Sequence, residues 1–277
     1  AYHDMPVATL TYYLHSFMSE AISEAGCRVA ISGNGADELF TGYYDHYSFW
    51  LAEMKNKNSF TDLQSDWQKS YGAYVQNPVL QDPLVFFKNP LERGHIFLNS
   101  ETFNAWLHDP FEETFEESEY SNNLLRNRML NEIRHETIPV ILHEDDRNSM
   151  YYSVENRSPY LDRDLAEFLF QIPPELLIKN GYVKYLLRAA GTGFVSDNVL
   201  WDKRKRGFNA PIDHLVDRKD KVTREHLMAD GPIFDIVRKD KIESYLNSDL
   251  TDNSFSKNLF SFISAKLFLE HYQDWNP

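Results

Sequence analysis

The sequence contains one cysteine, Cys27, in 277 residues, so an intramolecular disulfide is excluded. No run approaches the roughly 20 consecutive apolar residues of a membrane-spanning helix, and no basic-then-apolar signal segment follows Ala1. We therefore expect no membrane partner, and a single thiol fits a cytoplasmic location. Cys27 precedes a short apolar run, where a small structural hydrophobe is the expected role.

Basic residues are also scarce. The chain has 28 lysines and arginines against 42 aspartates and glutamates, which gives a formal net charge of −14. Such a surface repels the phosphate backbone of nucleic acids, so we expect no nucleic-acid partner. The compact basic run at residues 203–208 is interpreted as a local phosphate contact or a solvated segment.

The most informative stretch is residues 29–43, VAISGNGADELFTGY. Its first three residues are apolar without alternation, which predicts a short strand buried on both faces, as in a parallel sheet. Gly33 and Gly35 let the backbone bend and approach a ligand, and a helix is expected to start at Ala36. Strand, glycine turn and helix start are typical of a phosphate site, although a plain tight turn explains the local pattern equally well.

Two acids, Asp37 and Glu38, follow this turn directly. A bare carboxylate beside a polyphosphate repels it, unless a hard divalent cation lies between the two. Magnesium therefore belongs to the phosphate-site hypothesis.

A strand buried on both faces needs neighbouring strands, yet residues 1–28 contain only one helix-like segment. This helix is expected to begin near Pro6, with Asp4 as its cap, and to end at Gly26. We therefore expect the chain to be the later part of a longer protein. The missing strands are either cut away or supplied by another polypeptide.

Beyond the glycine turn the sequence predicts a mostly α-helical chain with few strands. Residues 1–43 carry the strand, the turn and the expected nucleotide site. Residues 44–139 predict a helical insertion with proline-containing loops, and residues 140–277 predict a helical C-terminal part.

Charged residues are dense between residues 142 and 162, where intrachain ion pairs such as Glu155 with Arg157 are the plain explanation. Further along, Lys184 and Arg188 are expected one turn apart on one helix face. There they could hold phosphate oxygens or a developing charge, and a solvated helix face explains the same spacing.

Five stretches together resemble the ordered motifs of the synthetase domain of glutamine-hydrolysing asparagine synthetases. They are SGNGADELFTGY at 32–43, DRNSM at 146–150, ENRSPYLD at 155–162, KYLLR at 184–188 and RKRGFNAP at 204–211. The resemblance runs from about Asp4 to Pro211. Five motifs in one order are more specific than any one of them.

The resemblance implies that the chain is the C-terminal part of an α/β ATP-pyrophosphatase domain. Such a domain uses ATP to activate a carboxylate, here expected to be aspartate, as an acyl-adenylate with release of pyrophosphate. Ammonia from a glutaminase domain then displaces AMP to give asparagine. The expected partners are this small carboxylate, ammonia and the missing N-terminal part of the same protein, and a homodimer is compatible with these features.

The resemblance also assigns roles to residues of this sequence. The expected ATP-binding residues are Ser32, Gly33, Gly35 and Arg188. The expected catalytic residues are Lys184 and Asp37, with Asp37 also holding Mg²⁺, because leaving pyrophosphate carries several negative charges that a cation and an ammonium stabilise. The expected substrate-binding residues are Asn34, Asp146 and Arg147.

Three departures from the family pattern bear on these expectations. The glutaminase domain with its terminal cysteine nucleophile is absent, and so is the Ser-Gly-Gly-x-Asp-Ser pyrophosphate loop that lies upstream in the family. The isolated chain is therefore expected to be inactive. The third is Asn34, where asparagine-making members usually carry a glutamate. A neutral amide cannot act as a base or pair ionically with Lys184.

Two alternatives stay open. A relative that amidates a sugar acid, or that closes a lactam or peptide ring with an internal amine, would keep the chemistry and change the carboxylate. A non-catalytic fragment would only bind a partner.

Overall fold

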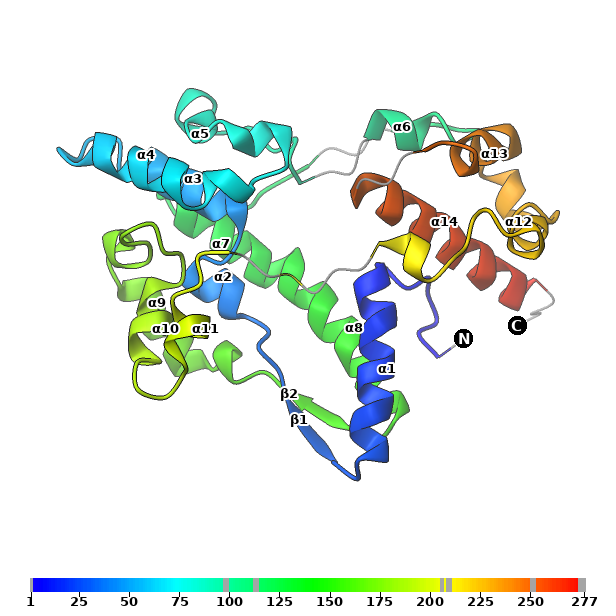
Figure 1. Cartoon of the computed structure of the whole chain (residues 1–277), viewed down its shortest axis with the longest axis horizontal. Coiled ribbons are helices and arrows are strands. Elements are labelled where there is room, and N and C mark those ends of the chain that lie inside the picture. Colours follow the sequence, from blue (N-terminus) through cyan, green and yellow to red (C-terminus); the bar gives the residue numbers. More distant parts are fainter. Residues whose placement is uncertain are drawn as a thin grey trace.

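The computed structural model describes residues 2–96, 100–111, 115–204, 207, 211–249 and 253–273. Over these residues the chain is mostly helical with a small parallel sheet, which confirms the predicted fold class (Figure 1). Within the same residues, no helix is both long and apolar enough to cross a membrane.

The elements follow one another from the N-terminus. The first helices are α1 (Leu10–Glu24), α2 (Ala36–Phe40), α3 (Tyr44–Glu53), α4 (Phe60–Lys69), α5 (Val85–Lys88), α6 (Ser100–Asn104) and α7 (Leu124–Arg134). The later helices are α8 (Thr137–Tyr151), α9 (Arg163–Gln171), α10 (Tyr185–Ala190), α11 (Asp197–Leu200), α12 (Lys221–Leu227), α13 (Lys239–Leu246) and α14 (Asn253–Tyr272). The strands are β1 (Val29–Ile31) and β2 (Glu155–Arg157). Short 3₁₀ helices lie at Gly72–Tyr74, Pro78–Gln81, Pro159–Leu161, Pro174–Leu176, Ile212–His214 and Pro232–Asp235.

Strands β1 and β2 pair in parallel, with Val29 opposite Glu155. The predicted strand is confirmed, but its predicted burial on both faces is wrong, because Val29 is 45% and Ile31 is 76% exposed. In the described part of the chain β2 is the one strand beside β1, so no further strand covers the other side. Cys27 is exposed as well, which overturns its expected role as a buried hydrophobe.

Helix α1 begins at Leu10 rather than near Pro6. Thr9, in extended conformation, is its N-cap. Asp4 lies outside the helix with a φ of 54°, and it accepts a hydrogen bond from the Tyr272 hydroxyl instead of capping α1. The helix ends at Glu24 and Gly26 adopts a φ of 77°, so the predicted stop at Gly26 is confirmed.

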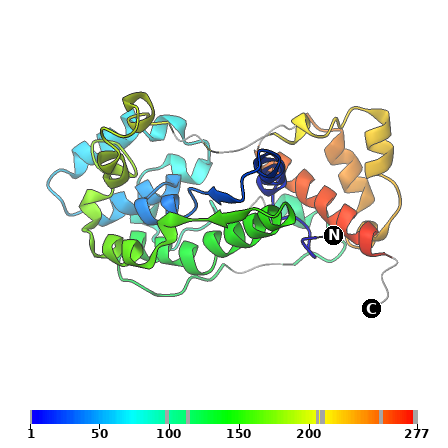
Figure 2. The ribbon, with the colours of Figure 1, turned by 90° about the horizontal axis from the view of Figure 1, so that it is seen from below.

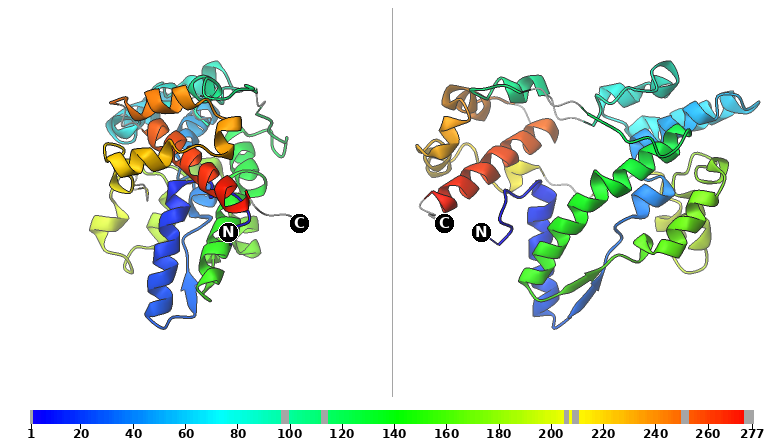
Figure 3. Two further views of the ribbon diagram at one scale, coloured as in Figure 1. Left: turned by 90° about the vertical axis from the view of Figure 1, so that its right-hand side faces the viewer. Right: turned by 180° about the vertical axis from the view of Figure 1, so that it is seen from behind.

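Two helical regions flank α1 and α8, which contact each other along the middle of the molecule (Figures 1 and 3). The region around α3, α4, α5 and α7 has a core that contains Trp50, Phe86 and Val183. The other region contains α12, α13 and α14, and its core includes Trp106 and Leu259. Figure 2 shows the two regions at opposite ends of α8. Each core combines residues from more than one of the three predicted segments, 1–43, 44–139 and 140–277. The predicted division of the chain into these segments stays a prediction.

Candidate functional site

The glycine turn between β1 and α2 has two glycines with different requirements. Gly35 has a φ of 90°, and a Cβ there would lie 2.4 Å from Cδ2 of Leu161. Both backbone conformation and packing therefore require glycine at this position. At Gly33, in contrast, a Cβ would meet no described atom within 4 Å. The fold does not fill the space beside Gly33, so the outer side of the turn is open to approach.

Ser32 joins the start of this turn to the end of β2. Its backbone N–H donates to the carbonyl oxygen of Arg157 at 2.8 Å, and its hydroxyl lies 2.9 Å from the hydroxyl of Ser158. These contacts bring two of the motifs, at residues 32–43 and 155–162, to the same place. The ion pair expected between Glu155 and Arg157 is also present, at 3.6 Å between exposed side chains.

The structure brings the two expected catalytic residues together. Lys184 Nζ lies 2.5 Å from Asp37 Oδ1, and the two side chains are 27% and 30% exposed. Asp37 stands on α2, one residue after the helix begins, while Lys184 is the N-cap of α10 with a φ of 55°. A carboxylate and an ammonium are thus paired where solvent reaches both.

Gly42 makes this pair possible. A Cβ at Gly42 would lie 1.6 Å from Asp37 Oδ1 and 2.6 Å from Lys184 Cε. The Gly42 N–H also donates to the Asp37 carbonyl oxygen at 2.8 Å. The sequence motif contained this glycine, but its contact with Lys184 depends on a residue 142 positions away, so no local pattern revealed it.

Arg188 is oriented differently from the sequence expectation. The helix begins after Lys184, so the two residues do not form one face inside a helix. Arg188 Nε donates to the carbonyl oxygen of Val183 at 2.8 Å, and its Nη1 donates to that of Leu200. Burial lowers the pKa of this half-buried guanidinium. Its expected contact with ATP stays a prediction.

The substrate-binding residues expected on α8, Asp146 and Arg147, do not line the cavity that adjoins the glycine turn. Asp146 is exposed, and the guanidinium of Arg147 lies 6.0 Å from the ring centroid of Tyr2. The preceding residue, Asp145, faces the turn instead and accepts a hydrogen bond from Asn34 Nδ2 at 2.8 Å. The sequence could not reveal this, because the rotation of α8 about its axis is set by its packing against α1.

A cavity of about 340 Å³ adjoins the turn between α1 and α8. Its polar lining consists of His15, Ser19, Ser32, Asn34, Asp145, Ser149 and Asn156. This volume lies at the small end of the range found for small-molecule sites.

A buried acid also anchors α2. Glu38 is 2% exposed and accepts a hydrogen bond from the Tyr43 hydroxyl at 2.5 Å. Burial raises the pKa of Tyr43, and the charges of Glu38 and Asp37 raise it further. Tyr43 therefore stays protonated and acts as the donor. The contact fixes the helix that carries Asp37.

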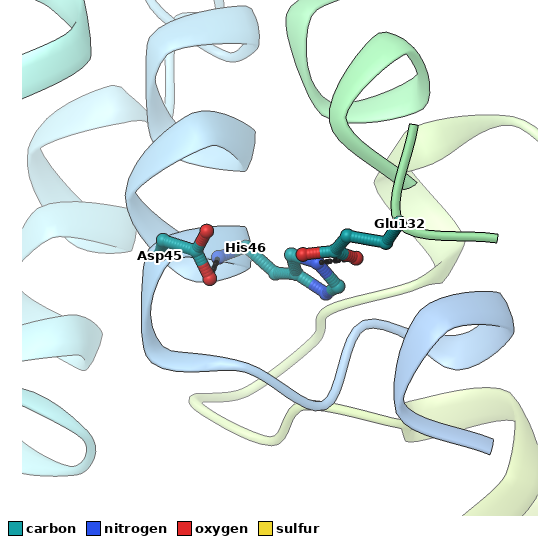
Figure 4. Close-up of side chains that lie close together, drawn as sticks. All are labelled: Asp45, His46 and Glu132. Carbon is teal, nitrogen blue, oxygen red and sulfur yellow. Dashed lines mark hydrogen bonds and ion pairs between the residues drawn. The ribbon is translucent and has the colours of Figure 1, made fainter. Parts of the chain in front are cut away.

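A second, fully buried charged cluster lies behind α2, where Asp45 and His46 on α3 face Glu132 on α7 (Figure 4). His46 Nε2 lies 2.7 Å from Glu132 Oε2. Arg128 Nε lies 3.3 Å from Glu132 Oε1 and 3.7 Å from Asp45 Oδ2. The guanidinium already supplies positive charge to both carboxylates, so we interpret this cluster as an ion-pair network rather than a metal site.

The network shifts the pKa values of its members. Burial alone would lower the pKa of His46, but the neighbouring carboxylates of Glu132 and Asp45 together raise it above its ordinary value. Burial alone would raise the pKa of Asp45, but the hydrogen bond from His95 and the nearby cations lower it well below its ordinary value. The network reaches the candidate site through the ring of Tyr43, whose centroid is 5.1 Å from that of His46.

Asp37 is the residue expected to hold magnesium, and this expectation stays a prediction. It belongs to no group of three candidate ligands in the part of the chain that the structure describes. Mg²⁺ is commonly bound by one or two carboxylates together with phosphate oxygens and waters. Asp37 can supply one such carboxylate.

The fifth motif, at residues 204–211, and the basic run at 203–208 are only partly described. Residues 205, 206 and 208–210 lie outside the described residues. Arg204 pairs with Asp202, with Nη2 2.9 Å from Oδ2.

The chain matches a family model described as asparagine synthase over residues 1–270. Asparagine synthetase (glutamine-hydrolysing) 1 of Bacillus subtilis is 29% identical over 253 residues, which are 82% of this chain and 38% of that protein. Two fungal proteins also match over 244 residues: amidase chry2 of Gibberella zeae at 22% identity and amidase chyE of Penicillium rubens at 24%. These matches cover 76% and 75% of this chain and 36% of each relative. The chain thus spans little more than a third of the length of these three relatives.

Proposed function

The chain belongs to the asparagine synthase family, and from this premise we propose that it carries the ATP-dependent, amide-forming site of a ligase. The observation that supports the proposal best is the contact between Asp37 and Lys184 beside an open glycine turn. Two opposite charges from distant segments meet there in partial contact with solvent.

The proposed reaction has two steps. A carboxylate oxygen of the substrate attacks the α-phosphorus of ATP, and the bond to the β-phosphate breaks to release pyrophosphate. Ammonia then attacks the acyl carbon, loses a proton, and AMP leaves with the electrons of the acyl C–O bond. The product is an amide.

Each residue of the site has a defined part in this reaction. Lys184 balances negative charge as pyrophosphate leaves and as the tetrahedral species forms. Asp37 holds Lys184 in place, and with Mg²⁺ bound it supplies one ligand to an ion that neutralises the phosphates.

The nucleotide lies beside the turn formed by Ser32, Gly33 and Gly35, and Arg188 is assigned to the nucleotide as well. Asn34 contacts the carboxylate substrate, with Asp146 and Arg147 at its periphery.

Aspartate is the proposed carboxylate and asparagine the proposed product. The name of the Bacillus subtilis relative supports this substrate. Glutamine-derived ammonia would come from a glutaminase domain in the N-terminal part of the same protein. A cytoplasmic location and a homodimer complete the proposal.

Amide formation on a different carboxylate is a second candidate. Asn34 supports this second candidate, because a neutral amide cannot act as a base or pair ionically with Lys184. In the structure the Asn34 amide is hydrogen-bonded to Asp145. Related amidotransferases or lactam-forming synthetases would use the same adenylation with another substrate.

The test uses the full-length natural protein that carries this sequence. It is incubated with Mg-ATP, aspartate and either glutamine or ammonium chloride, and pyrophosphate, AMP and asparagine are quantified. We expect Lys184→Ala to lower pyrophosphate release by roughly 100-fold or more. Lys221→Ala is the matched control, since Lys221 forms an exposed pair with Glu225 on α12 and should leave the rate unchanged. Equal rates in wild type and Lys184→Ala would instead support a non-catalytic, partner-binding module.

A further inference from the structure

A chain of two hydrogen bonds, called the relay below, links Asn34, Asp145 and His15 and fixes the Asn34 side chain in the middle of the glycine turn. Asn34 Nδ2 donates to Asp145 Oδ2 at 2.8 Å, and the other carboxylate oxygen of Asp145 lies 2.8 Å from His15 Nδ1. Asp145 is 111 residues from one partner and 130 from the other. The turn, α8 and α1 each contribute one residue, and all three line the 340 Å³ cavity.

The relay sets the orientation of the Asn34 amide. An ionised aspartate only accepts hydrogen bonds, so the NH₂ group of Asn34 must face Asp145. The carbonyl oxygen of Asn34 then points away from that carboxylate. Asp145 is 7% exposed, which keeps it close to Asn34 and His15 rather than in bulk water. Position 34 therefore presents a neutral acceptor oxygen.

The same geometry restricts what position 34 can be. A carboxylate there would face the carboxylate of Asp145 at hydrogen-bond distance, and two like charges at that range repel strongly. The negative charge of Asp145 also disfavours an anionic group of a ligand nearby. A ligand group with an N–H or O–H donor suits this part of the cavity better.

We propose that Asp145 and His15 are positioning residues that fix Asn34 as a specificity-determining residue for the carboxylate substrate. Asn34 Oδ1 accepts a hydrogen bond from a hydroxyl or amine group of that substrate. The site thereby selects carboxylates that carry such a donor over those that lack it. This proposal rests on the amide-forming function proposed above and names the substrate class of the same site.

The test compares two pairs of carboxylates that differ in one donor: aspartate with succinate, and 3-hydroxybutyrate with butyrate. Pyrophosphate release by the full-length natural protein is measured with Mg-ATP and ammonium chloride. We expect wild type to prefer the donor-bearing member of a pair by at least about tenfold in kcat/KM. In Asp145→Asn the side chain at 145 can donate or accept, so Asn34 can flip. The ratio of kcat/KM between the donor-bearing carboxylate and its partner should then fall toward one, with the KM for ATP unchanged.

A double variant separates positioning from a purely structural role. Asn34→Asp with Asp145→Asn restores the hydrogen bond with donor and acceptor exchanged, so the Tm lost in Asn34→Asp alone should return. The selectivity should not return to the wild-type value, because a charged oxygen now faces the cavity. We expect aspartate to gain at least about tenfold over 3-hydroxybutyrate, since a charged oxygen binds an ammonium more strongly than a hydroxyl.

Asp62→Ala, at an exposed position on α4, is the control and should not change selectivity. Pyrophosphate release without donor preference in wild type would overturn this proposal and leave the proposed function standing. Retention of the wild-type preference in Asp145→Asn would overturn the proposal in the same way. An unchanged ratio of aspartate to 3-hydroxybutyrate in the double variant would do so too. No pyrophosphate release with any carboxylate would overturn both.

Discussion

Two charged clusters lie close to α2, and they differ in burial. At the glycine turn, Asp37 and Lys184 are each about 30% exposed. Behind the helix, the side chains of His46, Glu132 and Arg128 are at most 4% exposed. Charged groups that are shielded from water must pair with one another and contribute to the fold, whereas partly exposed charged groups can exchange partners with a ligand. This difference separates a structural network from a chemical site.

The largest expected effect contrasts one cation from each cluster. Arg128→Met leaves buried carboxylates without their partner, and we expect a loss of about 3–5 kcal/mol in the free energy of unfolding. Lys184→Met removes a partly exposed partner of Asp37, so we expect a stability change of at most about 1 kcal/mol. Pyrophosphate release should nevertheless fall roughly 100-fold in Lys184→Met. Denaturant unfolding and the pyrophosphate assay on both variants check this, and similar stability losses in the two variants would erase the distinction.

The next effect concerns two glycines of the site. Gly42→Ala places a methyl group against Asp37 and Lys184, so we expect the ion pair to separate and kcat to fall by at least about tenfold. Gly33→Ala meets no described atom, and its Tm should stay that of wild type. Its KM for ATP should rise, because the methyl group occupies the side of the turn that a nucleotide approaches. Unchanged kinetics in Gly33→Ala would place the nucleotide elsewhere.

The smallest expected effect is the pH dependence of the buried network. The pKa of His46 is raised in the folded state, so folding favours its protonated form. This contribution is fully present below about pH 6.5 and is lost as the pH rises through the folded-state pKa. The lowered pKa of Asp45 acts at the other end: its contribution is present above about pH 4 and is lost as the pH falls through its folded-state value.

Urea midpoints between pH 6 and 9 check this dependence. The wild type should lose stability toward high pH, and His46→Gln, which cannot be protonated there, should lose less. Parallel curves for the two proteins would show that His46 does not contribute through its charge.

The local parts of the site could be predicted from the sequence. The apolar triplet, the glycine turn and the helix start at Ala36 are set by neighbouring residues, and the structure has them where the pattern put them. The family resemblance placed Asp37 and Lys184 in one site, because both residues lie in its motifs, but their direct ion pair was not predicted.

The parts that the sequence did not reveal depend on tertiary packing. Asp145 accepts a hydrogen bond from the turn and the neighbouring Asp146 is exposed, and this one-residue difference reflects how α8 is rotated against α1. The exposure of Ile31 depends on which strands cover the sheet, and an apolar run cannot specify that. Arg188 donates to the backbone carbonyl oxygen of Leu200, which a later segment of the chain brings beside it.

Transfer of oxygen-18 from the substrate tests the adenylation site most directly. The full-length natural protein is supplied with Mg-ATP, ammonia and the carboxylate it uses, labelled in both carboxyl oxygens, with aspartate tried first. Attack of that carboxylate on the α-phosphorus predicts one labelled oxygen in AMP for each amide formed, with unlabelled pyrophosphate, and almost no turnover in Lys184→Ala. Label in inorganic phosphate, accompanied by ADP, would contradict adenylation at the glycine turn.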